Sequence, residues 1–194
     1  MTRLIAVFFG VAVLTACQTM QPPLLPGQLF PGKGGLNVRA PDSPGWKLLD
    51  RVSGVNGMAF ARIGASPSES YTARVYVIAT PGSGGYDELV AFIRESAEKN
   101  TSPERFKSID RSYERTEKRG YPCVRVKSTM NDTMAMTPSG QTLLKLQMIT
   151  LACGFPERTD RGFIMEFSHR GLSLDVTLAM QAEAFFEGVQ IPEK

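Results

Sequence analysis

Histidine and tryptophan are nearly absent from this chain, which has one of each among its 194 residues. The single His169 directly follows Ser168, and neighbouring side chains on a strand point to opposite faces, so the two would not form a nucleophile and its base. The chain also lacks the nucleophile pattern G-x-S-x-G and the C-x-x-C pair of redox or zinc sites. We therefore expect no catalytic residues, no cofactor and no enzymatic activity.

Signatures for phosphate and nucleic acid are missing too. The glycine-rich segment 81–85 (PGSGG) stands between a strand pattern and a helix pattern, but it lacks the Walker lysine and the G-x-G-x-x-G spacing. Basic and acidic residues are intermixed, the formal net charge is +3, and no basic run is interleaved with aromatic residues. These absences predict a plain loop at residues 81–85 and exclude nucleic acid as a partner.

Long hydrophobic runs are absent except at the start of the chain. Residues 4–14 (LIAVFFGVAVL) are apolar and follow a positive charge at Arg3, as in the core of a signal peptide. The run of about 11 residues is too short for a membrane-spanning helix, which needs about 20. The N-terminal segment is therefore predicted to be an export signal.

The apolar run ends in the sequence LTAC at residues 14–17, which resembles the lipobox of bacterial lipoproteins. In that family the cysteine thiol receives a diacylglycerol, and a peptidase cuts the chain before it. The resemblance implies that residues 1–16 are a lipoprotein signal peptide and that Cys17 carries the lipid. Gln18 stands where an aspartate would retain a proteobacterial lipoprotein in the inner membrane, so the resemblance implies an outer-membrane anchor with the domain in the periplasm. An ordinary secretory peptide with a chance cysteine remains the alternative.

The segment after the predicted signal peptide is rich in proline and glycine. Residues 18–45 hold six of the 13 prolines and five of the 18 glycines, so this segment cannot form a helix or a central strand. We predict that residues 17–45 are a lipidated N-terminus and tether, followed by a single domain over residues 46–194. The alternative is an arm packed on the domain, which four apolar residues favour. These are Leu24, Leu25, Leu29 and Phe30.

From residue 46 onward the chain shows strand patterns and two helix patterns. Residues 86–99 place apolar side chains on one helical face, and residues 182–188 form a second, shorter helix pattern. Turn-forming residues at 137–140 predict a hairpin between two long strands. This order predicts the α+β class, with an antiparallel sheet flanked by helices. The expected strands are residues 46–51, 58–63, 71–80, 108–118, 121–130, 142–153, 163–169 and 172–178.

The arrangement resembles the Mog1/PsbP-like fold at three places. Pro44-Gly45-Trp46 opens the domain, a helix follows the third strand, and residues 184–191 (AFFEGVQI) close the chain. The resemblance covers residues 41–191 and implies an antiparallel sheet flanked by helices. Members of that group mostly act by binding partners, so the resemblance supplies no catalytic residues.

Two cysteines remain after Cys17, and they predict a disulfide. An even pair in an exported protein is typical of a structural disulfide. A turn centred between Pro138 and Ser139 places Cys123 and Cys153 on neighbouring strands within one residue of register, which suits the short Cβ separation of a disulfide. A redox or metal-binding pair is the alternative.

Methionines cluster around the predicted hairpin, at Met130, Met134 and Met136. Thioethers are soft ligands that suit Cu(I), but methionine also fills apolar gaps. The sequence therefore predicts a non-enzymatic binding or accessory subunit of a cell-envelope assembly, such as a secretion, pilus or outer-membrane complex. It would contact the membrane through its lipid and another envelope protein through its domain. A periplasmic lipoprotein that binds copper or another small ligand is the first alternative, and an envelope hydrolase whose site no sequence motif reveals is the second.

Overall fold

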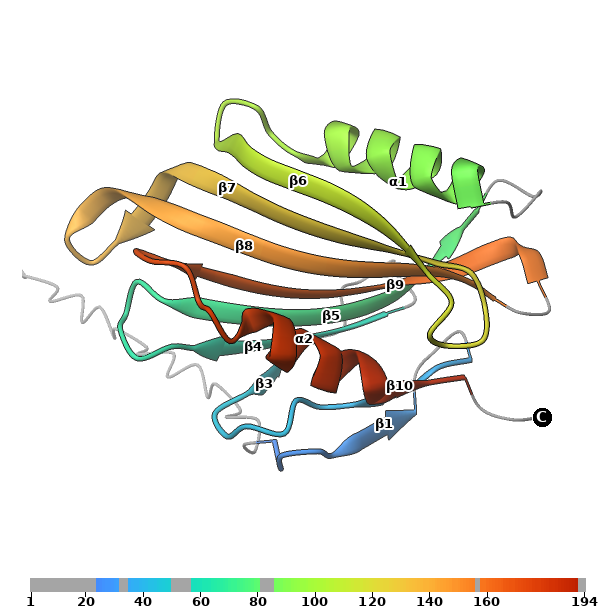
Figure 1. Cartoon of the computed structure of the whole chain (residues 1–194). Helices are drawn as coiled ribbons and strands as arrows, with labels where there is room; N and C mark the ends of the chain where they lie inside the picture. Colours follow the sequence, from blue (N-terminus) through green and yellow to red (C-terminus); the bar gives the residue numbers. More distant parts are fainter. Residues whose placement is uncertain (1–23, 32–34, 50–56, 81–85, 156–157, 192–194) are drawn as a thin grey trace, which may run out of the picture.

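The computed structural model describes residues 24–31, 35–49, 57–80, 86–155 and 158–191. Seven strands form one antiparallel sheet in the order β3-β4-β5-β9-β8-β7-β6, and three short strands form a second sheet in the order β1-β2-β10 (Figure 1). Helix α1 spans Tyr86–Asn100 and helix α2 spans Leu178–Glu187. Strands β1 to β10 are Leu29–Pro31, Asn37–Arg39, Lys47–Leu49, Gly57–Ile63, Ser70–Ala79, Phe106–Thr116, Cys123–Thr137, Gly140–Phe155, Arg158–Gly171 and Val189–Gln190. The α+β class and the antiparallel sheet flanked by helices are confirmed.

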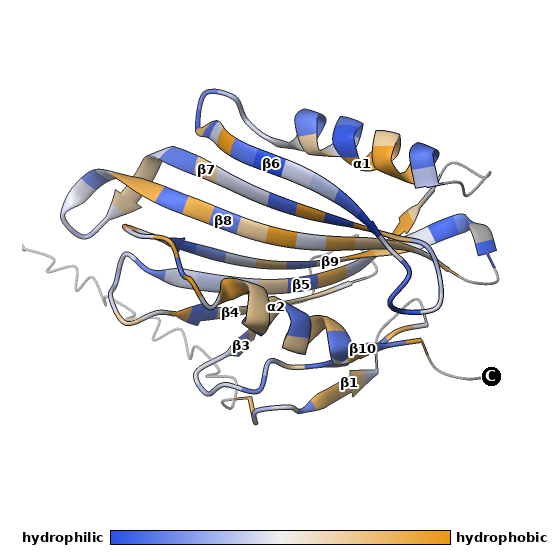
Figure 2. Cartoon of the chain, in the orientation of Figure 1, coloured by the Kyte–Doolittle hydropathy of each residue, from blue (hydrophilic) through white to orange (hydrophobic). Residues whose placement is uncertain are grey.

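The main sheet is covered on both faces. Helix α2 and the small sheet pack on one face over a core that includes Trp46, Phe60 and Phe167. Helix α1 packs on the other face, where Leu89 and Ile93 contact a separate apolar cluster from the strands. Strand β9 supplies apolar side chains to both cores at consecutive positions, which is typical of a central strand buried on both sides (Figure 2).

The arm before residue 46 packs on the domain, so the tether interpretation is wrong for its described residues, 24–31 and 35–45. Strand β2 pairs with β1 and also with β10 from the far end of the chain. The side chains of Leu36, Val38 and Ala40 alternate into the core and are no more than 3% exposed. Proline and glycine content describes local backbone preference only, and it does not reveal a pairing strand far away in the sequence. Residues 17–23 lie outside the described residues, as does the whole predicted signal peptide.

The local predictions hold better than the long-range ones. Helix α1 matches the predicted helix at residues 86–99, and β7 and β8 form the predicted hairpin. The predicted strand at residues 172–178 is wrong, because the chain there forms a loop and then begins α2. Apolar residues stand at every second position here, as in a strand, but all three are at least 50% exposed: Leu172, Leu174 and Val176. Within the described residues, no helix is long and apolar enough to cross a membrane.

Candidate functional site

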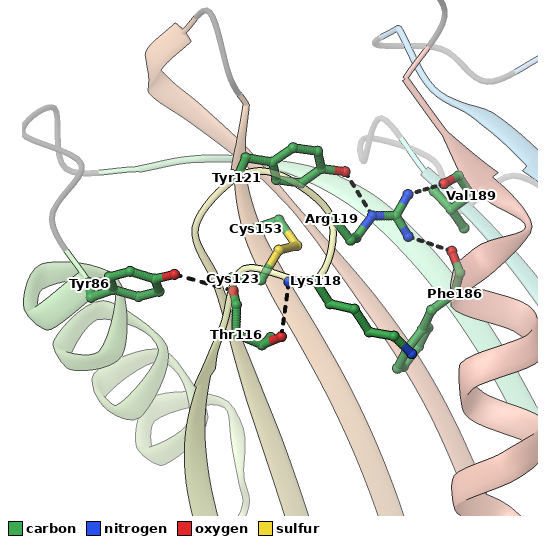
Figure 3. Close-up of a disulfide and its surroundings, with 9 residues drawn as sticks. All are labelled: Tyr86, Thr116, Lys118, Arg119, Tyr121, Cys123, Cys153, Phe186 and Val189. Atoms are coloured by element: carbon green, nitrogen blue, oxygen red, sulfur yellow. Dashed lines mark hydrogen bonds between the residues drawn. A yellow bond between two sulfur atoms is a disulfide. The ribbon is translucent and has the colours of Figure 1, made fainter.

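A disulfide joins β7 to β8 in the structure, as the hairpin register predicted. The strands turn tightly between Thr137 and Gly140, where Gly140 has a φ of 106° that disfavours other residues. An irregularity between Asp132 and Ala135 then shifts the register, which brings Cys123 directly opposite Cys153. Their Cα atoms are 4.1 Å apart, and both side chains are fully buried (Figure 3).

A surface groove of about 300 Å³ lies beside this disulfide, between the β6–β7 connection and α2. Its positive charges have partners. The Arg119 guanidinium donates hydrogen bonds to the carbonyl oxygens of Phe186 and Val189, at the C-terminal end of α2 (Figure 3). Arg125 forms an ion pair with Glu183 on the same helix. Phe186 lies in the last turn of α2 and Val189 begins β10, so these contacts hold the end of the helix and the strand that follows it to the sheet. The charged groups of the groove therefore have structural partners.

His169 is buried in a polar network rather than placed at an open site. It is 1% exposed, and its Nε2 lies 2.9 Å from Oε1 of Glu69. The Tyr71 hydroxyl oxygen lies 3.2 Å from Oε1 of Glu69 and 3.0 Å from Oδ2 of Asp175, so its one proton is shared between the two carboxylates. Ser168 pairs with Met148 and Thr72 on the adjacent strands, and it occupies the position next to His169 on the strand, on the opposite face. The network therefore ties β5 and β9 to the chain before α2 without bringing a nucleophile to the histidine.

The hydrogen bonds of this network favour the ionised form of its two carboxylates, Glu69 and Asp175. Burial disfavours the charge of Glu69, but hydrogen bonds from the Ala65 N–H, His169 and Tyr71 outweigh it and hold its pKa below the ordinary value. The pKa of Asp175 is lowered too, because hydrogen bonds from Thr177 and Tyr71 outweigh burial. Burial, together with these carboxylates, raises the pKa of the Tyr71 hydroxyl, which remains a donor.

Asp175 fixes the loop between β9 and α2. Its backbone N–H donates to Oε1 of Gln147 at 2.6 Å, and its carboxylate accepts hydrogen bonds from Tyr71, Thr177 and Gln181. Thr177 is the residue directly before the first turn of α2, so the hydrogen bond from its N–H to the Asp175 side chain forms a local turn that fixes the entry to the helix. The loop is therefore held in one conformation although its apolar side chains project outward.

These projecting side chains form an exposed apolar surface, which we call the apolar tip. Strand β8 pairs with the end of β9 at Lys145 and Gly171, so Leu143 lies beside the start of the loop. Met136 pairs with Gln141, which shares a face of β8 with Leu143. Figure 2 shows hydrophobic residues at this end of β7 and β8 and along the loop. The apolar tip consists of Met134, Met136, Leu143, Leu172, Leu174, Val176 and Met180, which are 50% to 95% exposed.

The structure separates the three methionines of the copper alternative. Met130 is 3% exposed and shares the α1 face of β7 with Val126, whereas Met134 and Met136 are exposed on the other face beyond the irregularity. Their sulfur atoms therefore do not converge on a common point, and the copper hypothesis has no geometric support. In the described part of the chain, no group of three or more His, Cys, Asp or Glu side chains could hold a metal ion.

A buried ion-pair cluster supports the tip from the α1 face. Asp132 is fully buried at the irregularity of β7 and accepts two hydrogen bonds of 2.9 Å from the Arg105 guanidinium. It also accepts one of 3.2 Å from Arg170 on β9. Burial disfavours the carboxylate, but these arginines outweigh it and hold the pKa of Asp132 below its ordinary value.

Replacing Asp132 with asparagine is expected to lower the free energy of unfolding by about 2–4 kcal/mol at pH 7, because two arginines lose their anionic partner. A lowered pKa means that the carboxylate stabilises the fold above its unfolded-state pKa and that this contribution is lost as the pH falls through the folded-state pKa. The difference between the wild type and the variant should therefore shrink below about pH 4. Urea unfolding at pH 7 and pH 3 measures it. Asp160→Asn removes an exposed carboxylate and is the control; equal stabilities of Asp132→Asn and the wild type at pH 7 would contradict the role of the cluster.

The chain is similar to a few solved structures, all at low sequence identity. No protein-family model matches the chain, and the search of curated proteins finds no match. The chain is similar to LpqN of Mycobacterium tuberculosis, a protein involved in cell envelope biogenesis, with a TM-score of 0.48, 19% identity and coverage of 88% of this chain and 90% of that one. It is also similar to the Ran-binding protein Mog1p of Saccharomyces cerevisiae, with a TM-score of 0.49, 9% identity and coverage of 81% and 90%.

A point mutant of Mog1 matches with a TM-score of 0.44, 10% identity and coverage of 81% of this chain and 91% of that one. Mog1 proteins, with whose fold the sequence was compared above, are thus among the solved structures that are similar to this chain.

Proposed function

We propose that this protein is a lipid-anchored, extracytoplasmic binding subunit that holds another envelope protein at its apolar tip and catalyses no reaction. The lipid would be attached to Cys17 and anchored in the outer membrane, with the domain in the periplasm. The partner would belong to a secretion, pilus or outer-membrane assembly. The observation that carries the proposal is the apolar tip, where large apolar side chains are exposed on a loop that hydrogen bonds hold in place.

Exposure of the apolar tip to water is unfavourable, and its loop is already held in one conformation. Val176 is 95% exposed, and its neighbours Leu172 and Leu174 are 68% and 50% exposed. Contiguous exposed apolar side chains of this kind mark interaction sites on soluble domains. Because Asp175 already fixes the loop, a partner would lose little conformational entropy by ordering it.

A protein partner fits this surface better than a lipid bilayer does. Segments that insert into membrane surfaces combine apolar residues with lysine or arginine and often with tryptophan or phenylalanine. Residues 172–180 (LSLDVTLAM) contain neither basic nor aromatic residues, and their one charge is the carboxylate of Asp175. A neutral apolar surface with an acidic residue at its base instead resembles the core of a protein–protein interface, which is depleted of charge.

Crosslinking in living cells tests the proposal. A photoreactive amino acid at position 176 of the full-length protein should give one discrete adduct with an envelope protein after irradiation. The same probe at position 109 is the matched control, because Ile109 is also an exposed apolar residue (52%) but lies on the edge strand β6, outside the apolar tip. Adding Leu174→Asp should reduce the adduct at position 176 about tenfold at equal protein level, because truncated anchor residues cost at least 1–2 kcal/mol of binding.

The outcomes separate the possible occupants. A protein adduct that is specific to position 176 and sensitive to Leu174→Asp supports the proposal. An adduct with phospholipid alone would assign the tip to the membrane instead. Equal adducts at positions 176 and 109, or none at either, would refute the binding surface. The charge introduced at Leu174 is exposed, so thermal unfolding should show a change in stability of no more than about 0.5 kcal/mol.

A further inference from the structure

A second cavity lies on the opposite face of the main sheet, beneath helix α1. Its volume is about 340 Å³, at the lower end of the range for small-molecule sites. Part of its wall is apolar and comes from Ile93 and Ala97 of α1 and from Val126 and Ile164 of the sheet. Polar side chains from β5, β6, β7 and β9 complete it, which gives the cavity an apolar side and a polar side.

The polar side holds a cation and a hydroxyl that face the cavity together. Arg111 on β6 pairs directly with Ser128 on β7, so their side chains stand next to each other on the same face. Ser128 is 5% exposed, and its hydroxyl oxygen has no hydrogen-bond partner among the described residues. The Arg111 guanidinium donates a long hydrogen bond of 4.0 Å to the sulfur of Met130. Among the described residues, no carboxylate forms an ion pair with it.

The other charges of the cavity neutralise each other. Arg74 forms an ion pair of 2.6 Å with Glu166, and the hydroxyl of Tyr76 donates a hydrogen bond of 3.4 Å to the same carboxylate. One positive charge therefore remains in the cavity, on Arg111, beside a buried hydroxyl without a partner. A buried hydroxyl needs a hydrogen-bond partner, and Ser128 has none in the part of the protein that the structure describes, so its hydroxyl is available to donate to a group that enters the cavity.

We propose that this cavity binds a small organic monoanion, whose carboxylate is held by Arg111 and Ser128. One carboxylate oxygen accepts hydrogen bonds from the guanidinium and the other accepts the Ser128 hydroxyl proton in a hydrogen bond, so the anion satisfies both groups at once. The apolar body of the ligand lies against Val126 and Ile164, between the sheet and α1. The cavity volume limits this body to a compact group, such as one ring on a short linker. The site is independent of the apolar tip, which lies on the far side of the sheet.

Calorimetric titration of the purified full-length mature protein with 3-phenylpropanoate tests the site, and two analogues isolate the role of charge. The carboxylate should bind with a dissociation constant below about 1 mM, the neutral 3-phenylpropanamide about tenfold more weakly, and the 2-phenylethylammonium cation not measurably. Arg111→Gln should weaken binding of the carboxylate about ten- to 100-fold and bring it level with the amide. Arg115→Gln is the matched control, because Arg115 lies on the same face of β6 but pairs with Asp87 outside the cavity; it should leave binding unchanged.

Ser128→Ala distinguishes a ligand-binding hydroxyl from a structural one. It should weaken binding of 3-phenylpropanoate severalfold while leaving the thermal stability of the free protein unchanged or raised, because the hydroxyl has no partner to lose. Ala97→Leu, which fills the cavity from α1, should abolish binding without unfolding the protein. The proposal is overturned if the carboxylate does not bind at millimolar concentration, if it binds no better than the amide, or if Arg115→Gln weakens it as much as Arg111→Gln does.

Discussion

Replacing Cys17 with serine is expected to release the protein from the membrane completely. The thiol is the group that accepts the diacylglycerol in proteins with a lipobox, and a serine hydroxyl at the LTAC sequence is too weak a nucleophile to replace it. Fractionation of cells and labelling with a radioactive fatty acid measure the effect. The wild type should be found with membranes and carry label, and the variant should be soluble in the periplasm and unlabelled.

The predicted outer-membrane sorting has its own matched variant. Gln18→Asp leaves Cys17 and the lipid in place but introduces the inner-membrane retention signal, so the protein should keep its label and move to the inner-membrane fraction. A Cys17→Ser variant that still carries label would refute the lipobox. A Gln18→Asp variant that stays with the outer membrane would refute only the sorting step, in a host that sorts lipoproteins by this rule.

Removing the disulfide is expected to lower the free energy of unfolding by about 3–4 kcal/mol. The bridge closes a loop of 30 residues between Cys123 and Cys153, and the loss follows from the larger conformational freedom of the unfolded chain without it. A Cys123→Ala/Cys153→Ala double variant, unfolded in urea beside the oxidised wild type, measures this loss. The bridge lies at the end of the hairpin far from the turn, so it joins the strand ends that the turn cannot hold together.

Chemical reduction provides the control for this double variant. Dithiothreitol should lower the stability of the wild type by a similar amount and leave the double variant unaffected. If the reductant changes neither protein, the two cysteines are not joined in the folded chain, and the predicted bond is wrong. If it destabilises both equally, the effect does not come from this pair.

How well the sequence predicted the structure depended on the distance between interacting residues. The β7–β8 hairpin was predictable because a local turn at residues 137–140 sets the register for both strands. The turn alone left an error of one residue, and the irregularity near Asp132 corrects it so that the cysteines face each other. No local pattern marks that irregularity, and the arginines that pair with Asp132 beside it, Arg105 and Arg170, are distant from it in the sequence.

The apolar tip and the cavity under α1 were harder to predict from the sequence than the hairpin. The loop after β9 carries apolar residues at strand spacing, and only its hydrogen bonds through Asp175 show that they stay in solvent. The cavity under α1 combines Arg111, Ser128 and Glu166 from three strands, and none of these residues stands in a recognisable motif. Arg111 belongs to a run of mixed charges that indicates a solvated strand face, and the missing signal was its pairing with Ser128 across the sheet.

The pairing of β2 with both β1 and β10 limits how far the domain could move from a lipid on Cys17. A free segment from Cys17 to Trp46 could extend about 100 Å, whereas the seven steps from Cys17 to Leu24, where the described fold begins, span at most about 25 Å. A lipid on Cys17 would therefore confine the domain to a thin layer against the bilayer, where it meets only partners that reach that layer themselves. Because β10 pairs with β2, deleting Val189 and Gln190 would weaken the pairing that holds β2 on the domain. The free segment between Cys17 and the fold would then become longer.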